Sequence, residues 1–196
     1  MERDIVRIGP KLVTIYFGWN DHWASFGVVD KNVASFNRRN PLSVSLSSLR
    51  LTQLFNFFHI KLYRDPGAKR RQERVSPDDF RDNLLAMVRI AREHDIVPVL
   101  VTAPTSHRRG AEPRYLATRW LNDLEDLVPL HRQYVDIVKQ VARRNDVLLL
   151  DLFGLFARLP AEDVKNRYFV ADGIHLTGEG SKAVGHLLYR FLEKHN

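Results

Sequence analysis

The sequence has no cysteine among its 196 residues. Disulfide bonds are therefore excluded, and so is a metal site built on thiolate ligands. This absence leaves the cellular compartment open. Hydrophobic residues make up 44% of the chain and charged residues 27%, which is typical of a soluble globular protein. The length is that of one domain with a substantial core, and we predict a single domain over residues 1–196.

The sequence also lacks a long uninterrupted apolar run. Its first ten residues, MERDIVRIGP, contain no apolar core of signal-peptide length, so the chain as given carries no recognisable leader. The localisation therefore stays unknown: cytoplasmic is the default, and a secreted or periplasmic location is the alternative if a segment precedes Met1.

The most apolar stretch, residues 42–62, reads LSVSLSSLRLTQLFNFFHIKL. Arg50, Gln53, Asn56 and several serines interrupt it, which argues against a membrane span. The stretch lies in residues 22–75, a segment that interrupts the strand and helix pattern described below. We interpret this segment as a packed structural insertion. A cap over a substrate cleft and a helix at a membrane interface are the alternatives.

The formal net charge of +7 raises the possibility of a nucleic-acid partner. The basic residues gather in GAKRRQER (67–74) and in short pairs that are spread along the chain. No single basic face and no nucleic-acid motif results. We therefore interpret the charge as a solvated basic surface and expect no nucleic-acid partner.

Strand patterns alternate with helical ones, which predicts an α/β fold with a parallel sheet. A capping serine, a proline and two acids, Ser76 to Asp79, mark a strong helix start. Gly9 and Pro10 close a short N-terminal helix. The predicted strands are residues 11–17, 96–104 and 146–153, and later helices cover residues 130–141 and 183–192. Residues 105–128 are predicted to be a long polar loop.

Polar side chains follow each predicted strand. Asn20 and Asp21 follow the first, residues 105–109 follow the second, and the sequence ADGIHLTGEG (171–180) lies beyond the third. In folds with parallel sheets, ligands bind at the carboxyl ends of the strands. These three groups are therefore candidates for one site. His107, Arg108 and Arg109 are interpreted as ordinary loop residues rather than as a substrate contact.

Asp172 and His175 stand three residues apart in a loop that leads into the last helix. If the loop turns back, the carboxylate can fix the imidazole tautomer and stabilise its protonated form. The second ring nitrogen is then free to take a proton from a hydroxyl nucleophile. The structural alternative is a capping aspartate beside a surface histidine.

Asn20 ends the sequence VTIYFGWN at the predicted carboxyl end of the first strand. A side-chain amide at that place can donate a hydrogen bond to the oxyanion that develops on a reacting carbonyl. Asn20 and Asp21 are also good turn residues, so a plain strand ending is the alternative.

The combination of GWND (18–21) with DGIHLTGEG (172–180) resembles the SGNH or GDSL-type hydrolase family. The first motif matches the family's third sequence block and the second matches its fifth. VLVTAP (99–104) resembles the strand between them. The resemblance implies a three-layer α/β/α sandwich, flavodoxin-like, with a parallel sheet.

The resemblance also implies roles for four residues. Asn20 is an oxyanion-hole donor, His175 is the general base, Asp172 orients His175, and Gly18 keeps the loop tight. Members of the family cleave esters through an acyl-serine intermediate and need no metal or other cofactor.

The family's first block, the Gly-Asp-Ser that carries the nucleophile, has no match in this sequence. No serine occurs anywhere before Gly18. Ser25 and Ser106 lack the strand-to-turn context of a nucleophile and are interpreted as loop serines. We expect the chain to be the C-terminal portion of a domain whose N-terminal strands are missing. The alternative is a short chain that is inactive or completed by a partner.

The leading functional hypothesis is a serine ester hydrolase that acts on a small-molecule or carbohydrate ester. An O-acyltransferase with the same residues and a catalytically inactive binding module are the alternatives. A sheet without its nucleophile-bearing strand would expose an apolar edge, so we expect the chain to associate. The sequence does not define an oligomeric state.

Overall fold

The computed structural model describes residues 5, 7–25, 29–32, 70–117 and 120–195. Most of the predicted insertion at residues 22–75 lies outside the described residues, and so does the apolar stretch at 42–62. The interpretation of that segment, and with it the division of the chain into one domain plus an insertion, stays a prediction. No helix among the described residues is long and apolar enough to cross a membrane.

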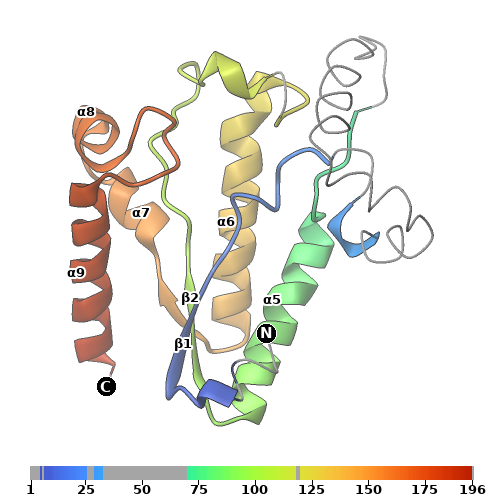
Figure 1. Ribbon diagram of the computed structural model, residues 1–196, viewed down its shortest axis with the longest axis vertical. Helices are drawn as coiled ribbons and strands as arrows, with labels where there is room; N and C mark the ends of the chain where they lie inside the picture. Colours follow the sequence, from blue (N-terminus) through green and yellow to red (C-terminus); the bar gives the residue numbers. More distant parts are fainter. Residues whose placement is uncertain (1–4, 6, 26–28, 33–69, 118–119, 196) are drawn as a thin grey trace, which may run out of the picture.

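Three parallel strands form the sheet of the described chain, in the order β1-β2-β3. They are β1 (Leu12–Tyr16), β2 (Val97–Val101) and β3 (Leu148–Leu150). Leu12 lies opposite Val97 and Tyr16 opposite Val101. Since the strands run in one direction, all three carboxyl ends meet at the same edge of the sheet (Figure 1).

Two long helices cover one face of the sheet, α5 (Pro77–Glu93) and α6 (Leu127–Arg144) (Figure 1). Ser76 caps α5 by accepting a hydrogen bond from the backbone N–H of Asp79, as the sequence predicts. Apolar residues of both helices form one buried cluster with strand residues Ile15 and Leu100. Of the four buried clusters in the described part of the chain, this one is the largest.

The other face of the sheet packs against the last helix, α9 (Gly178–Lys194). Val99, Val101 and Leu150 form its buried centre, and a stripe of α9 lies on them: Val184, Leu187, Leu188 and Phe191. Helices therefore lie on both faces of a parallel sheet, and the predicted three-layer α/β/α architecture is confirmed.

The third strand is shorter than its sequence predicts. The pattern at residues 146–153 predicts a continuous strand, but pairing covers only Leu148–Leu150, and α7 (Leu152–Ala157) follows at once. Asp151 is the reason, because its side chain accepts a hydrogen bond from the backbone N–H of Gly154 and caps α7. The apolar Leu152 thus belongs to a helix rather than to the strand.

The segment at residues 105–128 is also more ordered than the polar loop that its sequence predicts. It contains two short 3₁₀ helices, η1 (Arg114–Leu116) and η2 (Leu124–Asp126), and Leu116 and Leu121 in it are buried. A further short helix, α8 (Ala161–Asp163), and the π-helical turn η3 (Val164–Tyr168) precede α9.

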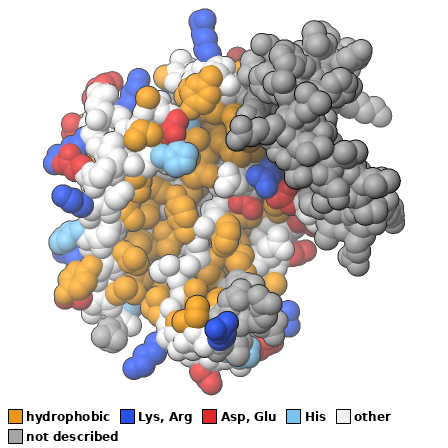
Figure 2. All heavy atoms as spheres, in the orientation of Figure 1, with side chains coloured by type: hydrophobic (Ala, Val, Ile, Leu, Met, Phe, Trp, Pro, Cys, Tyr) orange, Lys and Arg blue, Asp and Glu red, His pale blue; other side chains and the backbone are white. Residues whose placement is uncertain are grey.

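One part of the sheet is left uncovered by the described residues. Hydrophobic side chains gather over β1 and β2 on the face seen in Figure 2. Tyr16, Phe17 and Val97 are 46%, 49% and 46% exposed. Within the described chain β1 pairs only with β2, so its other edge carries no neighbouring strand. Among the described residues, β1 therefore has an apolar edge that is exposed, as the sequence predicts.

Candidate functional site

The two candidate motifs lie at the carboxyl edge of the sheet. Asn20 follows β1, while Asp172 and His175 lie in the loop between η3 and α9. Ile174 of that loop packs against a buried cluster that contains Trp19, the residue before Asn20. Two segments from opposite ends of the sequence are thus neighbours in space.

The turn after β1 is closed by its own aspartate. Gly18 has a φ of +130°, a conformation that L side chains rarely adopt, and its N–H donates to Asp21 Oδ2 over 2.9 Å. Burial raises the pKa of the Asp21 carboxyl even though this hydrogen bond opposes the shift. Asn20 is exposed, and its side-chain amide has no hydrogen-bond partner among the described residues.

Buried aromatic rings pack against the turn that follows β1. Trp19 is 8% exposed and stacks on His131, with ring centroids 3.9 Å apart. His131 donates from Nε2 to the carbonyl oxygen of Ala103 over 3.0 Å, because a carbonyl can only accept. Its Nδ1 then accepts from His22 Nε2 over 3.2 Å. Burial lowers the pKa of both imidazoles, that of His131 to about 4, so both are neutral at pH 7.

Asp172 and His175 form a hydrogen-bonded pair. His175 Nδ1 lies 2.6 Å from Asp172 Oδ2, while Asp172 Oδ1 accepts from the backbone N–H groups of Ile174 and His175 over 2.9 Å each. Burial acts to raise the pKa of the Asp172 carboxyl. The hydrogen bonds from His175 and Ile174 outweigh it and hold that pKa below its ordinary value.

The second ring nitrogen of His175 is open to solvent. The His175 side chain is 77% exposed and that of Asp172 is 29% exposed. Nε2 of His175 has no hydrogen-bond partner within the described chain. The imidazole thus has one nitrogen oriented by a carboxylate and one open to solvent, which is the arrangement that a general base needs.

The segment after β2 holds the Asp172–His175 loop in place. The Ser106 N–H and Thr105 Oγ1 donate to the carbonyl oxygen of Gly173 over 3.1 and 3.2 Å. His107 Nε2 donates to the carbonyl oxygen of Asp172 over 2.8 Å. His107 is 6% exposed, so it is a buried loop residue rather than a solvated loop charge, and the interpretation that it makes no substrate contact stays a prediction. No periodicity in a loop could have shown that this ring is buried.

Ser25 and Ser106 both lie in irregular segments of the described chain. Ser25 is 5% exposed, and its backbone N–H donates to the Gln72 carbonyl. Ser106 is half-buried beside Gly173. Neither sits on a sharp strand-to-helix turn that would present its hydroxyl at the carboxyl edge. Their interpretation as loop serines stays a prediction.

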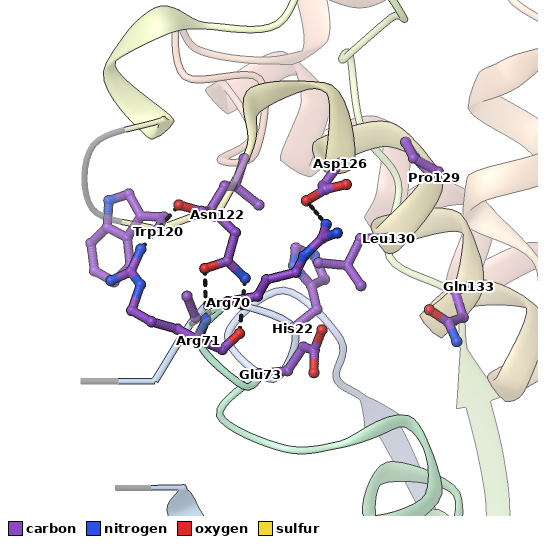
Figure 3. A pocket seen from close by; sticks show the side chains of 12 residues that line it. His22, Arg70, Arg71, Glu73, Trp120, Asn122, Asp126, Pro129, Leu130 and Gln133 are labelled. Carbon is purple, nitrogen blue, oxygen red and sulfur yellow. Dashed lines mark hydrogen bonds and ion pairs between the residues drawn. The ribbon is translucent and has the colours of Figure 1, made fainter. Parts of the chain in front are cut away.

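A separate cavity of about 300 Å³ is lined by His22 together with residues of the segments around Arg70 and Asn122 (Figure 3). Several of its polar side chains are hydrogen-bonded. Arg70 pairs with Asp126, and the Asn122 side chain exchanges hydrogen bonds with the backbone of Arg71. None of the candidate catalytic residues lines it. The candidate catalytic residues thus lie at the carboxyl ends of the strands, outside this cavity.

Three known proteins illustrate what the chain is similar to. The uncharacterized lipoprotein YqeF of Bacillus subtilis (strain 168) is 26% identical over 132 residues, which are 57% of this chain and 50% of that protein. A lipase/acylhydrolase from Enterococcus faecalis has a TM-score of 0.56 at 16% identity, over 99% of this chain and 67% of that one. A variant of Axe2, an acetyl-xylooligosaccharide esterase from Geobacillus stearothermophilus, has a TM-score of 0.50 at 17% identity, over 97% and 66%.

The similarity to the Enterococcus faecalis protein and to Axe2 shows a shared fold. The chain spans 50% of the length of its curated relative and 67% and 66% of the two solved structures. A family model, that of the GDSL-like lipase/acylhydrolase family, matches residues 1–183. That match covers most of the chain, including GWND and DGIH. The chain therefore belongs to the GDSL-like lipase/acylhydrolase family.

Proposed function

We propose that this chain carries the acid–base and oxyanion-binding part of a serine ester hydrolase. One observation carries the proposal: His175 Nδ1 lies 2.6 Å from an Asp172 carboxylate that is itself held by two backbone N–H groups. His175 is the general base, Asp172 orients it, and Asn20 donates to the oxyanion. Gly18 supports the turn that presents Asn20.

The proposed reaction has two steps. A serine hydroxyl attacks the ester carbonyl and gives its proton to His175 Nε2, while the oxyanion of the tetrahedral intermediate accepts from the Asn20 amide. The intermediate collapses to an acyl-serine, and the imidazolium returns the proton to the leaving alcohol. Water then attacks the acyl group with the same help from His175. Asp172 stabilises the imidazolium in both steps.

We propose that the nucleophilic serine lies outside these 196 residues. Ser25 and Ser106 lie in irregular segments rather than on a sharp strand-to-helix turn, which supports this. The edge of β1 that pairs with no other described strand supports it too. The open Nε2 of His175 faces no hydroxyl within the described chain, as expected if another segment supplies it.

We propose an acyl or O-acetyl ester of a small molecule or carbohydrate as the substrate class. The fold neighbour Axe2 is an acetyl-xylooligosaccharide esterase, so an O-acetylated sugar is the first natural ester to test. An acyltransferase would use the same residues, with an acceptor alcohol in place of water. Adding such an alcohol and analysing the product separates the two reactions.

The test begins with the native protein purified from its source. Its intact mass and N-terminal sequence show whether a Gly-Asp-Ser segment is present, and p-nitrophenyl acetate measures hydrolysis. In an active preparation, we expect Asn20→Ala to lower kcat by about 10²–10³-fold, since one oxyanion donor is lost. Asn166→Ala, which removes an exposed amide bonded to Glu162, is the matched control. Equal activity of the Asn20 variant and wild type would contradict the assignment.

A binding module that keeps the cleft but not the chemistry is the second candidate. The absence of a Gly-Asp-Ser block from the sequence favours it. It predicts a native product of 22.8 kDa that is neither labelled by a fluorophosphonate probe nor active on esters. A labelled serine in the native product would exclude it.

A further inference from the structure

We propose that His107 is a positioning residue that fixes the loop of Asp172 and His175 against the turn that carries Asn20. The catalytic importance of this role rests on the proposed function. The contacts themselves do not, because one buried imidazole touches both motifs.

The first contact is a hydrogen bond to the acid–base loop. His107 Nε2 lies 2.8 Å from the carbonyl oxygen of Asp172, so Nε2 carries the proton. The bond restrains the peptide that joins Asp172 to Gly173. The Asp172 carboxylate, whose Oδ2 lies 2.6 Å from His175 Nδ1, is attached to that same backbone.

The second contact is with the turn after β1. The His107 ring meets Trp19 edge to face, with ring centroids 5.6 Å apart and an interplanar angle of 80°. Trp19 directly precedes Asn20 in the turn that Gly18 and Asp21 close. One ring therefore lies between the oxyanion donor's turn and the general base's loop.

Gly173 shows how closely the two loops fit. A Cβ on this residue would lie 2.6 Å from His107 Nε2 and 2.8 Å from Ser106 Oγ. Gly173 also has a φ of +72°, which favours glycine. A side chain at this position would push the loops apart, so the missing side chain is what allows the hydrogen bond from His107 to form.

The chemistry of His107 suits positioning rather than proton transfer. Its Nε2 proton is used by a backbone carbonyl, and the ring is 6% exposed. Burial lowers the pKa of the imidazole, although the carbonyl and the Asp172 carboxylate oppose the shift, so the ring is neutral at pH 7. A neutral ring donates one directional hydrogen bond and adds no charge beside Asp172.

The test measures the tautomer of His175 in the chain as given by long-range ¹H–¹⁵N correlation at alkaline pH. The Asp172 contact favours a proton on Nδ1, whereas an unrestrained imidazole prefers Nε2. His107→Leu removes the donor, while His107→Gln keeps an N–H donor at the same distance along the side chain. His131→Leu is the matched control, because it also alters a buried histidine beside Trp19 but one bonded to Ala103.

We expect His107→Leu to lower the Nδ1–H to Nε2–H ratio of His175 by about tenfold, the effect of losing one hydrogen bond to the loop. The Gln variant and the His131 control should keep the wild-type ratio. An unchanged ratio in a folded Leu variant overturns the proposal, as does a Gln variant that behaves like Leu. If the Leu variant does not fold, Gly173→Ala takes its place and must lower the ratio as well.

A kinetic measurement links the proposal to the reaction. In an active preparation, His107→Leu should lower kcat by about 10²-fold and change KM little, with the Gln variant largely restored, since misplacing a catalytic group affects the chemical step. Equal losses in both variants would contradict a positioning role. If wild type hydrolyses no ester, the proposed function fails, and the tautomer ratio still decides the role of His107.

Discussion

At the scale of single residues, Asp172 makes the largest number of the hydrogen bonds described in the candidate site. One oxygen of its carboxylate accepts from two backbone N–H groups, and the other faces His175 Nδ1. Its own carbonyl oxygen accepts from His107. The residue therefore fixes the loop through its backbone and orients the imidazole through its side chain.

Replacing Asp172 by asparagine removes the negative charge of the carboxylate while keeping a side chain of nearly the same shape. The Asp172→Asn side chain keeps an oxygen for the backbone N–H groups but can turn its amide toward His175, which then takes the wrong tautomer. We expect kcat to fall by about 10³–10⁴-fold in an active preparation, with unfolding in urea little changed. Asp123→Asn, at an exposed carboxylate before η2, is the control. A variant with wild-type kcat would show that the carboxylate has no role.

The pairing of Asp172 with His175 could be predicted because it depends on local spacing and one turn of chain. The position of His107 could not, since its burial depends on Trp19 and Gly173, which lie far from it in the sequence on either side. Sequence patterns report local geometry and strand ends. They do not report which loop residue will fill the space between two motifs.

At the scale of elements, the turn after β1 depends on glycine for its conformation rather than for space. A Cβ on Gly18 would meet no atom within 4 Å, yet its φ is +130°. Gly185 in α9 also has open space around it, but no such φ. Substitutions at Gly18 and Gly185 therefore distinguish the effect of backbone strain from that of steric contact.

We expect Gly18→Ala to destabilise the protein by about 1–3 kcal/mol, since a side chain must adopt a rarely populated backbone conformation. Gly185→Ala should instead stabilise it by about 0.5–1 kcal/mol, because alanine is the better helix former. Urea unfolding of the two variants beside wild type measures both effects. The interpretation fails if the two substitutions change stability in the same direction.

The elements themselves were largely predictable, because periodicity and caps are local signals. Ser76 and the stripe of α5 predict that helix, and β1 and β2 follow from their β-branched residues. The end of β3 could not be predicted, since an aspartate at position 151 is compatible both with a strand and with a helix cap. Contacts with other elements fix the helix cap, because Asp151 accepts from Thr102, just after β2, and pairs with Lys139 of α6.

At the scale of the whole molecule, the uncovered face of β1 predicts association. Thr14 and Tyr16 on this strand are exposed, and one edge of β1 meets no other described strand. We expect the chain as given to self-associate at micromolar concentration, and Thr14→Lys or Tyr16→Lys to reduce this, since a charge on an edge strand blocks pairing. Sedimentation velocity measures it, with Leu159→Lys as the control outside the sheet. A strictly monomeric wild-type chain would contradict the prediction.

The buried histidines predict a stability that falls as the solution becomes more acidic. The pKa of His131 is about 4 in the folded protein against 6.5 ordinarily, and the pKa of His22 is also lowered. Below about pH 6.5 the unfolded chain takes up protons that the folded protein does not. His131 alone should then cost about 2 kcal/mol of stability near pH 5, and the loss should level off below about pH 4.

Urea unfolding near pH 7.5 and near pH 5 tests this loss. The His131→Leu variant should show a smaller difference between the two pH values than wild type does. Equal pH dependence in the two proteins would show that His131 does not contribute.

The parallel pairing of β1 with β2 has a consequence for how the protein folds. Leu12 meets Val97 only across a long intervening stretch of chain, whereas α5, β2, α6 and β3 follow one another closely. Contacts between residues that are distant in the sequence form late, because closing a long loop costs conformational entropy before the contacts contribute any favourable free energy. We therefore expect α5 to β3 to assemble first and β1 to dock last. On the ribosome the turn that carries Asn20 is made early, yet it reaches its place only after β2 has been synthesised.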